Sequence, residues 1–244
     1  MARKRIDVLL VERGLFDSRS QARQAIEAGG VAVFGLPVSK PSEQVDELAE
    51  ITAEPAHGWV GRGALKLAHA LECWKIVAEA KVVLDIGAST GGFTEVCLEG
   101  GARRVFAVDV GRGQLHPRVA NDPRVVNLEG VDARSLDHEM IDEAPHLIVC
   151  DASFIGLEKV LAAALGLAAS GADLIALVKP QFQLGPGRVG KGGIIKDPEA
   201  RQEALAGVEA FVNAAGWRVQ AMLQSPLTGG DGNIEFLLWA KGPV

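Results

Sequence analysis

Cysteine is scarce in this sequence, and no two cysteines have the spacing of a metal site. Only three of the 244 residues are cysteines, and Cys73, Cys97 and Cys150 lie far apart with no Cys-x-x-Cys pair. Disulfide scaffolds and structural zinc sites depend on paired or clustered cysteines. The sequence therefore argues against both, predicts no bound metal and fits a reducing compartment.

A long apolar run is also missing. The most apolar stretch, residues 160–178, is interrupted by Ser170, Gly171 and Asp173 and falls short of the roughly 20 residues that cross a bilayer. The basic residues at the start are not followed by the apolar segment of a signal peptide. We therefore expect a soluble, cytoplasmic protein with no membrane partner.

An excess of positive charge is absent too, because 25 lysines and arginines stand against 31 acidic residues, for a net charge of -6. Such a protein is not a general polyanion binder, so any contact with nucleic acid must come from a local basic patch. Internal repeats and low-complexity tracts are likewise lacking. What is present is a chain with 48% hydrophobic residues, enough for one or two domains with ordinary cores.

The composition changes near residue 60. Before that point, a helical face begins at Ile6 and ends at Gly14, and Ser18 with Gln21 three residues later forms a capping box for a second helix. Two predicted strands follow, at residues 31–34 and 50–52. We place a small domain at residues 1–58, a linker at 59–63 and a larger domain at 64–244.

The larger domain alternates short apolar runs with helical stretches, which predicts an α/β fold with a doubly wound parallel sheet. The expected strands are residues 82–84, 105–108, 125–128, 147–150 and 174–178, and the clearest helices are residues 94–98 and 157–169. Two later runs, residues 218–223 and 234–240, are joined by a glycine-rich turn. They predict an antiparallel hairpin at the edge of the sheet.

Polar residues close four of the predicted strands. Asp85, Asp109, Asp151 and Lys179 each follow directly on an apolar run. Because ligands of open parallel sheets bind outside the carboxyl ends of the strands, these four ionisable groups predict a cleft along one rim.

A glycine-rich loop, residues 87–93, joins the first of these strands to a helix. Its glycines allow a ligand to approach the backbone closely, but the loop is neither a GxGxxG fingerprint nor a phosphate loop, since no lysine follows it. Asp109 comes 22 residues after Gly87, where a carboxylate can bind ribose hydroxyls. The pattern predicts a nucleoside-containing ligand and leaves nicotinamide and S-adenosylmethionine both open.

Glu235 lies within a strongly apolar run, where a carboxylate is costly unless it is paired. We expect Lys179 to be its partner, since both lie in strands of one sheet. The sequence around Lys66, by contrast, is typical of a helix in which the lysine is exposed to solvent.

A second glycine-rich loop covers residues 183–197. It carries five glycines together with the basic residues Arg188, Lys191 and Lys196. Such a loop is typical either of a mobile lid that meets RNA or of an ordinary surface loop.

Six stretches of the chain, in order, carry a family resemblance. They are residues 62–67 (RGALKL), 84–94 (LDIGASTGGFT), 109–115 (DVGRGQL), 151–155 (DASFI), 178–182 (VKPQF) and 232–235 (GNIE). Together they resemble the TlyA family of ribosomal RNA 2′-O-methyltransferases, which belongs to the FtsJ-like methyltransferases and whose first members were named haemolysins. The resemblance covers essentially the whole chain.

This resemblance implies a Rossmann-like, seven-stranded methyltransferase sheet, with S-adenosylmethionine as the cofactor. It maps a catalytic Lys-Asp-Lys-Glu tetrad onto Lys66, Asp151, Lys179 and Glu235. The cofactor-binding residues that it implies are Asp85, Gly87, Ala88, Ser89, Gly91, Gly92, Phe93, Asp109 at the ribose and Asp132 at the adenine amino group.

The first domain resembles the small RNA-binding domain named after ribosomal protein S-four, in residues 5–14 and 18–23. Arg19 and Arg23 are four residues apart and so share one helix face. With the basic residues near the start they predict a phosphate-binding patch. The expected RNA-binding residues are Arg3, Lys4, Arg5, Arg19, Arg23 and Arg62.

The implied reaction moves a methyl group from S-adenosylmethionine to a ribose 2′-hydroxyl of ribosomal RNA, with ribosomal RNA or a ribosomal subunit as the partner. The family points to a cytidine, although no residue here specifies the base. We expect Lys179 to contact the hydroxyl, Asp151 and Glu235 to orient Lys179, and Lys66 to act as a positioning charge. A protonated lysine cannot act as a base, so Lys179 must lose its proton or act electrostatically.

Two other functions stay open on the sequence. The first is a non-catalytic RNA-binding or ribosome-assembly factor, which has no need of an intact tetrad. The second is a membrane-lytic haemolysin, which requires an amphipathic or spanning segment, and the sequence offers neither.

Overall fold

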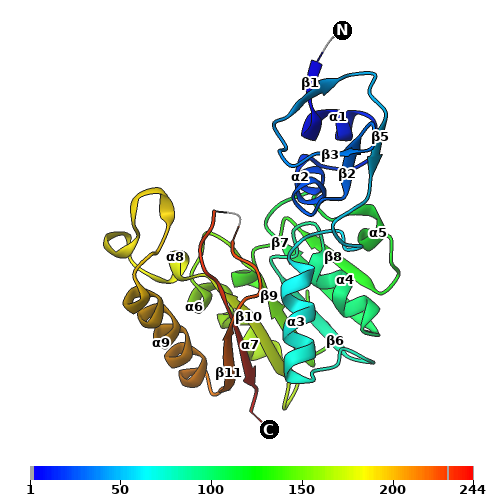
Figure 1. Cartoon of the computed structure of the whole chain (residues 1–244). Coiled ribbons are helices and arrows are strands. Elements are labelled where there is room, and N and C mark those ends of the chain that lie inside the picture. Colours follow the sequence, from blue (N-terminus) through cyan, green and yellow to red (C-terminus); the bar gives the residue numbers. More distant parts are fainter. Residues whose placement is uncertain (1–2, 230, 244) are drawn as a thin grey trace. The chain divides into compact units, whose positions relative to one another are not determined.

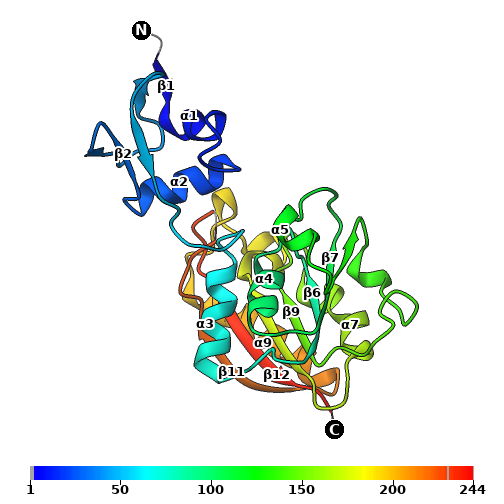
Figure 2. The ribbon, with the colours of Figure 1, turned by 90° about the vertical axis from the view of Figure 1, so that its right-hand side faces the viewer.

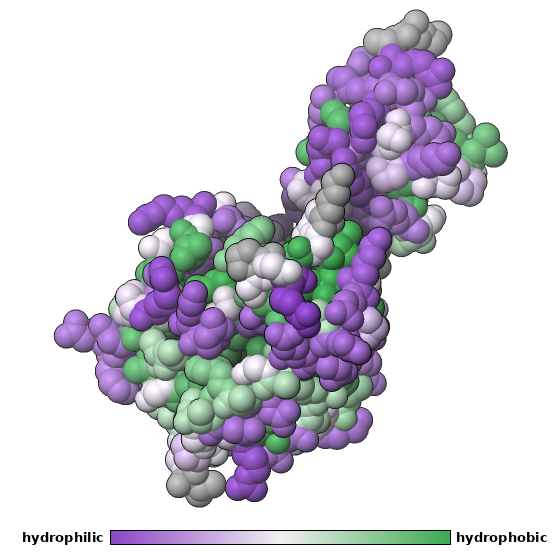
Figure 3. Space-filling model, turned by 90° about the vertical axis from the view of Figure 1, so that its left-hand side faces the viewer, coloured by the Kyte–Doolittle hydropathy of each residue, from purple (hydrophilic) through white to green (hydrophobic). Residues whose placement is uncertain are grey.

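A computed structural model describes residues 3–229 and 231–243, and the chain divides into two compact units, Met1–Gly58 and Trp59–Val244 (Figure 1). The five residues expected to form a linker lie in the larger unit, where Val60 is buried in the core. On the face that Figure 3 shows, hydrophilic side chains cover much of the surface of each unit, with apolar ones between them.

The small unit packs two helices on short strands. Its elements are β1 (Arg3–Arg5), α1 (Ile6–Glu12), α2 (Arg19–Glu27), β2 (Val31–Val33), β3 (Leu36–Pro37), β4 (Gln44–Asp46) and β5 (Ile51–Ala53). The Ser18 side chain caps α2 by accepting a hydrogen bond from the Gln21 backbone N–H, as the capping box predicts. Strand β1 pairs with β4, and neither was expected, because a three-residue strand rich in polar side chains gives no apolar alternation.

The larger unit is the predicted α/β fold. Its helices and strands are α3 (Ala64–Trp74), β6 (Val82–Ile86), α4 (Gly92–Glu99), β7 (Arg104–Asp109), α5 (Pro117–Ala120), β8 (Val125–Glu129), β9 (Leu147–Cys150), α6 (Leu157–Val160), α7 (Ala162–Leu167), β10 (Asp173–Val178), α8 (Pro180–Gln183), α9 (Pro198–Ala214), β11 (Arg218–Gln224) and β12 (Phe236–Lys241). Within the described residues, no helix combines the length and the apolar character needed to cross a bilayer.

Seven strands form one sheet in the order β11-β12-β10-β9-β6-β7-β8. The five strands from β10 to β8 are parallel, and β12 runs antiparallel between β10 and β11. The predicted hairpin is confirmed, with β11 as the edge strand and β12 inside the sheet.

Apolar side chains cover both faces of the sheet, because alternate residues of a strand point to opposite sides. In β6, Leu84 and Ile86 pack in a core with α6, α7 and α9, while Val83 packs in a second core with α3 and α4. Figure 2 shows α3 and α4 on the near side of the sheet. The parallel strands therefore end together at one rim between two helical layers.

The loop between α8 and α9 contains two short 3-10 turns, Pro186–Arg188 and Lys191–Gly193. Its far end is held by Asn233, which is buried. The Asn233 Oδ1 accepts a hydrogen bond from the Ile195 N–H (2.9 Å), and its Nδ2 donates to the Gly193 carbonyl (2.9 Å). The side chain of Lys191 lies outside the described residues.

Candidate active site

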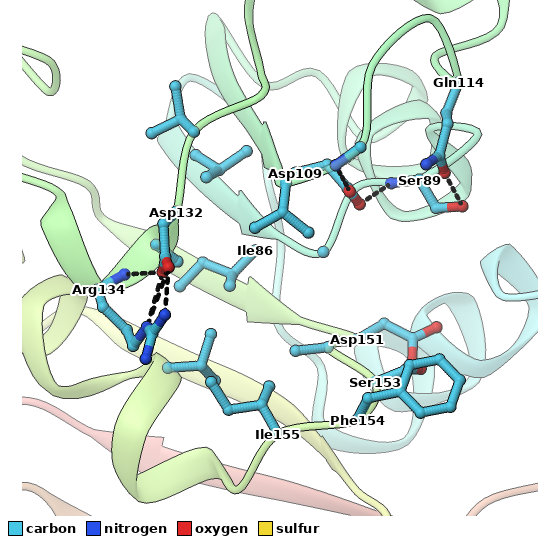
Figure 4. Close-up of a pocket in the computed structure, with 18 residues that line it drawn as sticks. Ile86, Ser89, Asp109, Gln114, Asp132, Arg134, Asp151, Ser153, Phe154 and Ile155 are labelled. Carbon is cyan, nitrogen blue, oxygen red and sulfur yellow. Dashed lines mark hydrogen bonds and ion pairs between the residues drawn. The ribbon is translucent and has the colours of Figure 1, made fainter.

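The carboxyl ends of β6, β7, β8 and β9 line a cavity of about 580 Å³ in the larger unit (Figure 4). Its size falls in the range of about 300–1,000 Å³ that is usual for small-molecule sites. Ser89, Asp109, Asp132 and Asp151 all lie on its wall. The rim that the sequence predicts is thus a real concave surface, and it brings together residues from four strand ends.

Asp109 connects two loops at this cavity. Its Oδ2 accepts a hydrogen bond from the Ser89 N–H (2.9 Å), and its Oδ1 accepts one from the Gly111 N–H (2.7 Å), as Figure 4 shows. A carboxylate oxygen has two lone pairs, so each oxygen can still accept a hydrogen bond from a ligand hydroxyl. The fixed carboxylate therefore suits the ribose-binding role that was expected of it.

Asp132 lies on the same cavity but already has a partner. Its carboxylate accepts hydrogen bonds from the Arg134 side chain, the shortest at 2.6 Å, and from the Arg134 backbone N–H. These hydrogen bonds, led by the one from the guanidinium, lower the pKa of Asp132 to about 2. A ligand amino group at Asp132 would share the carboxylate with Arg134.

The structure places Asp85, a predicted cofactor-binding residue, away from both cavities. Asp85 is fully buried, lines neither of the two cavities described here, and accepts a hydrogen bond from the Thr94 hydroxyl (2.6 Å). Strand β6 continues to Ile86, which lines the cavity, so the preceding side chain points to the opposite face. Burial raises the pKa of Asp85 to about 7.

Glycine is required at two positions of the loop after β6. Gly87 has φ +81°, and a Cβ there would lie 3.0 Å from the backbone of Ala152. Gly91 has φ +93°, and a Cβ there would lie 2.9 Å from the Leu115 side chain. Gly91 lines neither cavity, so the structure gives it the role of starting α4 beside Leu115.

A smaller cavity of about 200 Å³ adjoins the larger one and shares part of its wall. The residues common to both cavities are Gly87, Ser89, Asp151 and Ser153. Those that only the smaller cavity adds are Gly61, Arg62, Gly63, Ala88, Thr90, Gly92, Phe93 and Lys179. The expected cofactor residues Ala88, Gly92 and Phe93 therefore face the smaller cavity.

Lys179 is the buried cation of this shared region. Its Nζ lies 2.6 Å from Asp151 Oδ1 and donates hydrogen bonds to the Ser153 hydroxyl (2.7 Å) and the Asp151 carbonyl (3.2 Å). The side chain is only 7% exposed, so its charge is shielded from bulk water. One ion pair and two hydrogen bonds thus fix the ammonium group at the smaller cavity, against Asp151 and Ser153, which line both cavities.

The expected pairing of Glu235 with Lys179 is wrong, because Glu235 is paired with Lys66. Phe236 lies opposite Val178 in the ladder between β12 and β10, so Lys179 follows β10 and Glu235 precedes β12 at the same end of the paired strands. Helix α3, however, brings Lys66 to Glu235, while Lys179 contacts Asp151 at the end of β9. Lys66 is buried rather than solvated, and the tetrad is built as two ion pairs.

Phe154 is a residue that sequence reasoning missed. It lines the larger cavity, is 90% exposed and has φ +65°. Its ring lies 5.1 Å from that of Phe182, measured between centroids. A left-handed φ is uncommon for a bulky residue, and such residues gather at ligand-binding sites. The only signal in the sequence is that a phenylalanine follows a strand end.

The expected RNA-binding residues also have partners. Arg3 donates a hydrogen bond to the Gln44 carbonyl (2.6 Å), and Lys4 pairs with Glu12 (2.7 Å) and Glu47 (3.3 Å). The remaining three of the small unit, Arg5, Arg19 and Arg23, all pair with Asp7. Arg62 belongs to the larger unit and donates to the Thr228 carbonyl (2.6 Å). Among residues 3–229 and 231–243, no cluster of three His, Cys, Asp or Glu side chains is placed to hold a metal ion.

Two family models match the chain, one on each unit. Residues 59–242 match the FtsJ-like methyltransferase model, and residues 4–51 match the S4 domain model. The first match covers well over half of the sequence.

Known proteins with similar sequences cover nearly the whole chain. It is 46% identical over 244 residues to the "16S/23S rRNA (cytidine-2'-O)-methyltransferase TlyA" of Mycobacterium tuberculosis, covering 99% of this chain and 91% of that protein. It is 37% identical to "Hemolysin A" of Brachyspira hyodysenteriae, covering 96% and 98%. A solved structure of a hemolysin-named protein from Streptococcus thermophilus has a TM-score of 0.79 at 37% identity, covering 100% of this chain and 90% of that one.

Proposed function

The chain belongs to the FtsJ-like methyltransferase family, and we propose that it transfers a methyl group from S-adenosylmethionine to the 2′-hydroxyl of a cytidine in ribosomal RNA. The larger unit carries out the transfer, and residues 1–58 bind the RNA. The observation that carries this proposal is the Lys179 ammonium at the smaller cavity, held by Asp151 and Ser153, which line both cavities. A cofactor site and a separate acceptor site meet at one buried cation.

The larger cavity fits S-adenosylmethionine by its chemistry. Asp109 offers two fixed carboxylate oxygens for ribose hydroxyls, and the Gly87 backbone leaves no room for a side chain beside Ala152. The carboxylates on its wall suit a cationic ligand. When bound there, the cofactor supplies an activated methyl group on a positively charged sulfur.

Lys179 acts on the acceptor oxygen. The hydroxyl oxygen must be aligned with the methyl carbon and must release its proton to solvent as the new bond forms, and a nearby cation stabilises the charge that develops on the oxygen. The Asp151 and Ser153 contacts fix the ammonium for this role without reorganisation during the reaction. Lys66 and Glu235 form the second ion pair, and neither of them lines the two cavities.

The acceptor is RNA rather than a small molecule. A base whose ribose enters this site must be unstacked from its neighbours, and unpaired bases stack on exposed aromatic rings. Phe154, 90% exposed on the wall of the larger cavity, provides such a ring and follows Ser153, the hydrogen-bond partner of Lys179, in the chain. We infer that the RNA is ribosomal RNA, which is the substrate in the name of its relative from Mycobacterium tuberculosis.

The test is methyl transfer to ribosomal subunits prepared from cells that lack the modification. With cofactor carrying a labelled methyl group, we expect label in the RNA that survives mild alkali as an uncleaved dinucleotide, since 2′-O-methylation protects the adjacent phosphodiester. Each subunit and the free RNA are tested separately. Cofactor binding with no label in any of the three would contradict the proposal and favour a non-catalytic RNA-binding protein.

Replacing Asp109 by asparagine should weaken cofactor binding. The asparagine side chain has the shape of aspartate but lacks the charged carboxylate that accepts the ribose hydrogen bonds. A hydrogen bond to a charged group contributes about 1.5–3 kcal/mol. We expect the Kd for S-adenosylhomocysteine, measured by titration calorimetry, to rise about 10- to 150-fold. Asp142→Asn is the matched control, because Asp142 is an exposed carboxylate paired with Arg104 away from the cavities. Equal affinity in both variants would remove Asp109 from the site.

A further inference from the structure

One buried carboxylate in the small unit is shared by three guanidinium groups. The Asp7 side chain has no solvent exposure. Arg5 donates to both of its oxygens (2.9 and 3.1 Å), Arg19 donates to Oδ2 (2.8 Å), and Arg23 also donates to Oδ2 (3.1 Å). Three positive charges on one negative charge leave this group with a net charge of about +2.

The Asp7 carboxyl group is ionised at neutral pH. The hydrogen bond from Arg5 is the largest influence, and those from Arg19 and Arg23 add to it, so the pKa of Asp7 lies far below its usual range despite the cost of burial. Asp7 therefore remains an acceptor for all three arginines wherever the protein is folded and active.

The arginines come from two places in the chain and would otherwise repel one another. Arg5 ends β1, while Arg19 and Arg23 lie one turn apart on α2. Like charges at this spacing destabilise a helix. Asp7, at the start of α1, offsets that repulsion and fixes the direction of three long, flexible side chains.

The three guanidinium groups stay accessible even though they share a partner. Their side chains are 38%, 51% and 49% exposed for Arg5, Arg19 and Arg23, respectively. Each guanidinium has five N–H donors, and only four hydrogen bonds in total go to Asp7. Most of the donors can therefore reach a ligand. Planar guanidinium forks bind phosphate oxygens with defined geometry, and ordering them beforehand lowers the entropy cost of binding.

We propose that Asp7 is a positioning residue that holds Arg5, Arg19 and Arg23 as a preformed cluster for phosphates of the RNA. This rests on the proposed function, since it assumes that RNA is the substrate. Asp7 touches neither the RNA nor the reacting groups, and it acts through the arginines alone. A negatively charged residue thus strengthens the binding of a polyanion.

The test uses the sign of the effect of Asp7→Asn in the full-length protein. If charge alone mattered, removing a negative charge would tighten RNA binding. If Asp7 positions the arginines, binding should weaken about 5- to 50-fold, because several side chains must then be ordered on binding. The probe is unmodified ribosomal RNA, measured at several salt concentrations, and the KM for RNA should rise while kcat and the Kd for S-adenosylhomocysteine stay unchanged.

Glu12→Gln is the matched control. Glu12 also lies on α1, is exposed, and pairs with Lys4, so its replacement makes the same change in net charge without touching the cluster. We expect it to bind RNA as tightly as the wild type or slightly more tightly. Equal or tighter binding by Asp7→Asn as well would overturn the proposal.

A second variant covers the case in which Asp7→Asn does not fold. The double change Arg19→Lys and Arg23→Lys keeps both charges on the exposed face of α2 but removes the planar forks, and we expect RNA binding to weaken here too. Unchanged binding by this variant would also overturn the proposal. A wild-type protein that neither binds nor methylates RNA would instead contradict the proposed function itself.

Discussion

The Lys179→Ala variant should lose methyl transfer almost completely while still binding the cofactor. Positioned acid–base and charge-stabilising groups typically contribute about 10²- to 10⁴-fold, and we expect kcat to fall within that range. Lys179 lines only the smaller cavity, whereas Asp109 and Asp132 line the larger one, so binding of S-adenosylhomocysteine should change by less than about threefold. The measurements are single-turnover transfer to ribosomal subunits and calorimetric titration of the same preparations.

Lys159→Ala provides the comparison for this experiment. Lys159 is an exposed lysine on α6 that lines neither cavity, so its loss should leave both quantities unchanged. A Lys179→Ala enzyme that keeps more than a tenth of the wild-type rate would show that the ammonium is not needed. Loss of cofactor binding would instead assign Lys179 to the cofactor cavity.

The second large effect concerns the pair formed by Lys66 and Glu235. Both side chains are buried, at 8% and 4% exposure, so Glu235→Ala leaves a cation in the interior without its partner. Removing one member of a buried ion pair lowers the free energy of unfolding by about 3–5 kcal/mol, so the urea midpoint of Glu235→Ala should fall. All four tryptophans lie in the larger unit, at positions 59, 74, 217 and 239, so their fluorescence in urea reports the unfolding of that unit alone.

Replacing both Lys66 and Glu235 by apolar residues distinguishes an effect of the ion pair on stability from an effect on methyl transfer. A well-packed apolar replacement of a buried ion pair is often neutral or stabilising, so Lys66→Met with Glu235→Leu should restore the urea midpoint. If the pair supports the acceptor site, this stable double variant will still transfer methyl groups poorly. The control is Glu203→Ala, because the surface pair of Glu203 with Arg188 is worth less than about 1 kcal/mol. A Glu235→Ala midpoint equal to that of the control would refute the buried-pair argument.

The sheet could be predicted from the sequence because its strands are marked by local patterns. Strands β6 and β9 contain short apolar runs, residues 82–84 and 147–150, each followed by an aspartate, and buried parallel strands are typically made of such runs. Strand β1 could not be found, since three charged residues have no apolar alternation. Helix α9 was also not predicted, although Asp197 and Pro198 give it a common helix start.

Several residues on the walls of the two cavities were predicted, but the contacts between them were not. Strand ends indicate which polar residues share a rim, and Asp109, Asp151 and Lys179 do line the two cavities. The partner of Glu235 depends on where helix α3 packs on the sheet, which no local pattern records. Asp85 lies inside β6, which continues to Ile86, so the two side chains point to opposite faces of the sheet. A strand predicted to end at residue 84 does not fix the direction of the Asp85 side chain.

The position of β12 has a consequence for synthesis of the chain. Strand β12 is translated after β10 and β11, yet it lies between them, so β10 has an unpaired edge until residues 236–241 emerge from the translating ribosome. An unpaired edge is prone to association with other chains. The ion pair of Lys66 with Glu235 joins residues 169 positions apart and forms only at the same late stage. A nascent chain therefore cannot complete this site early, and chains truncated before β12 should aggregate rather than accumulate as partly active enzyme.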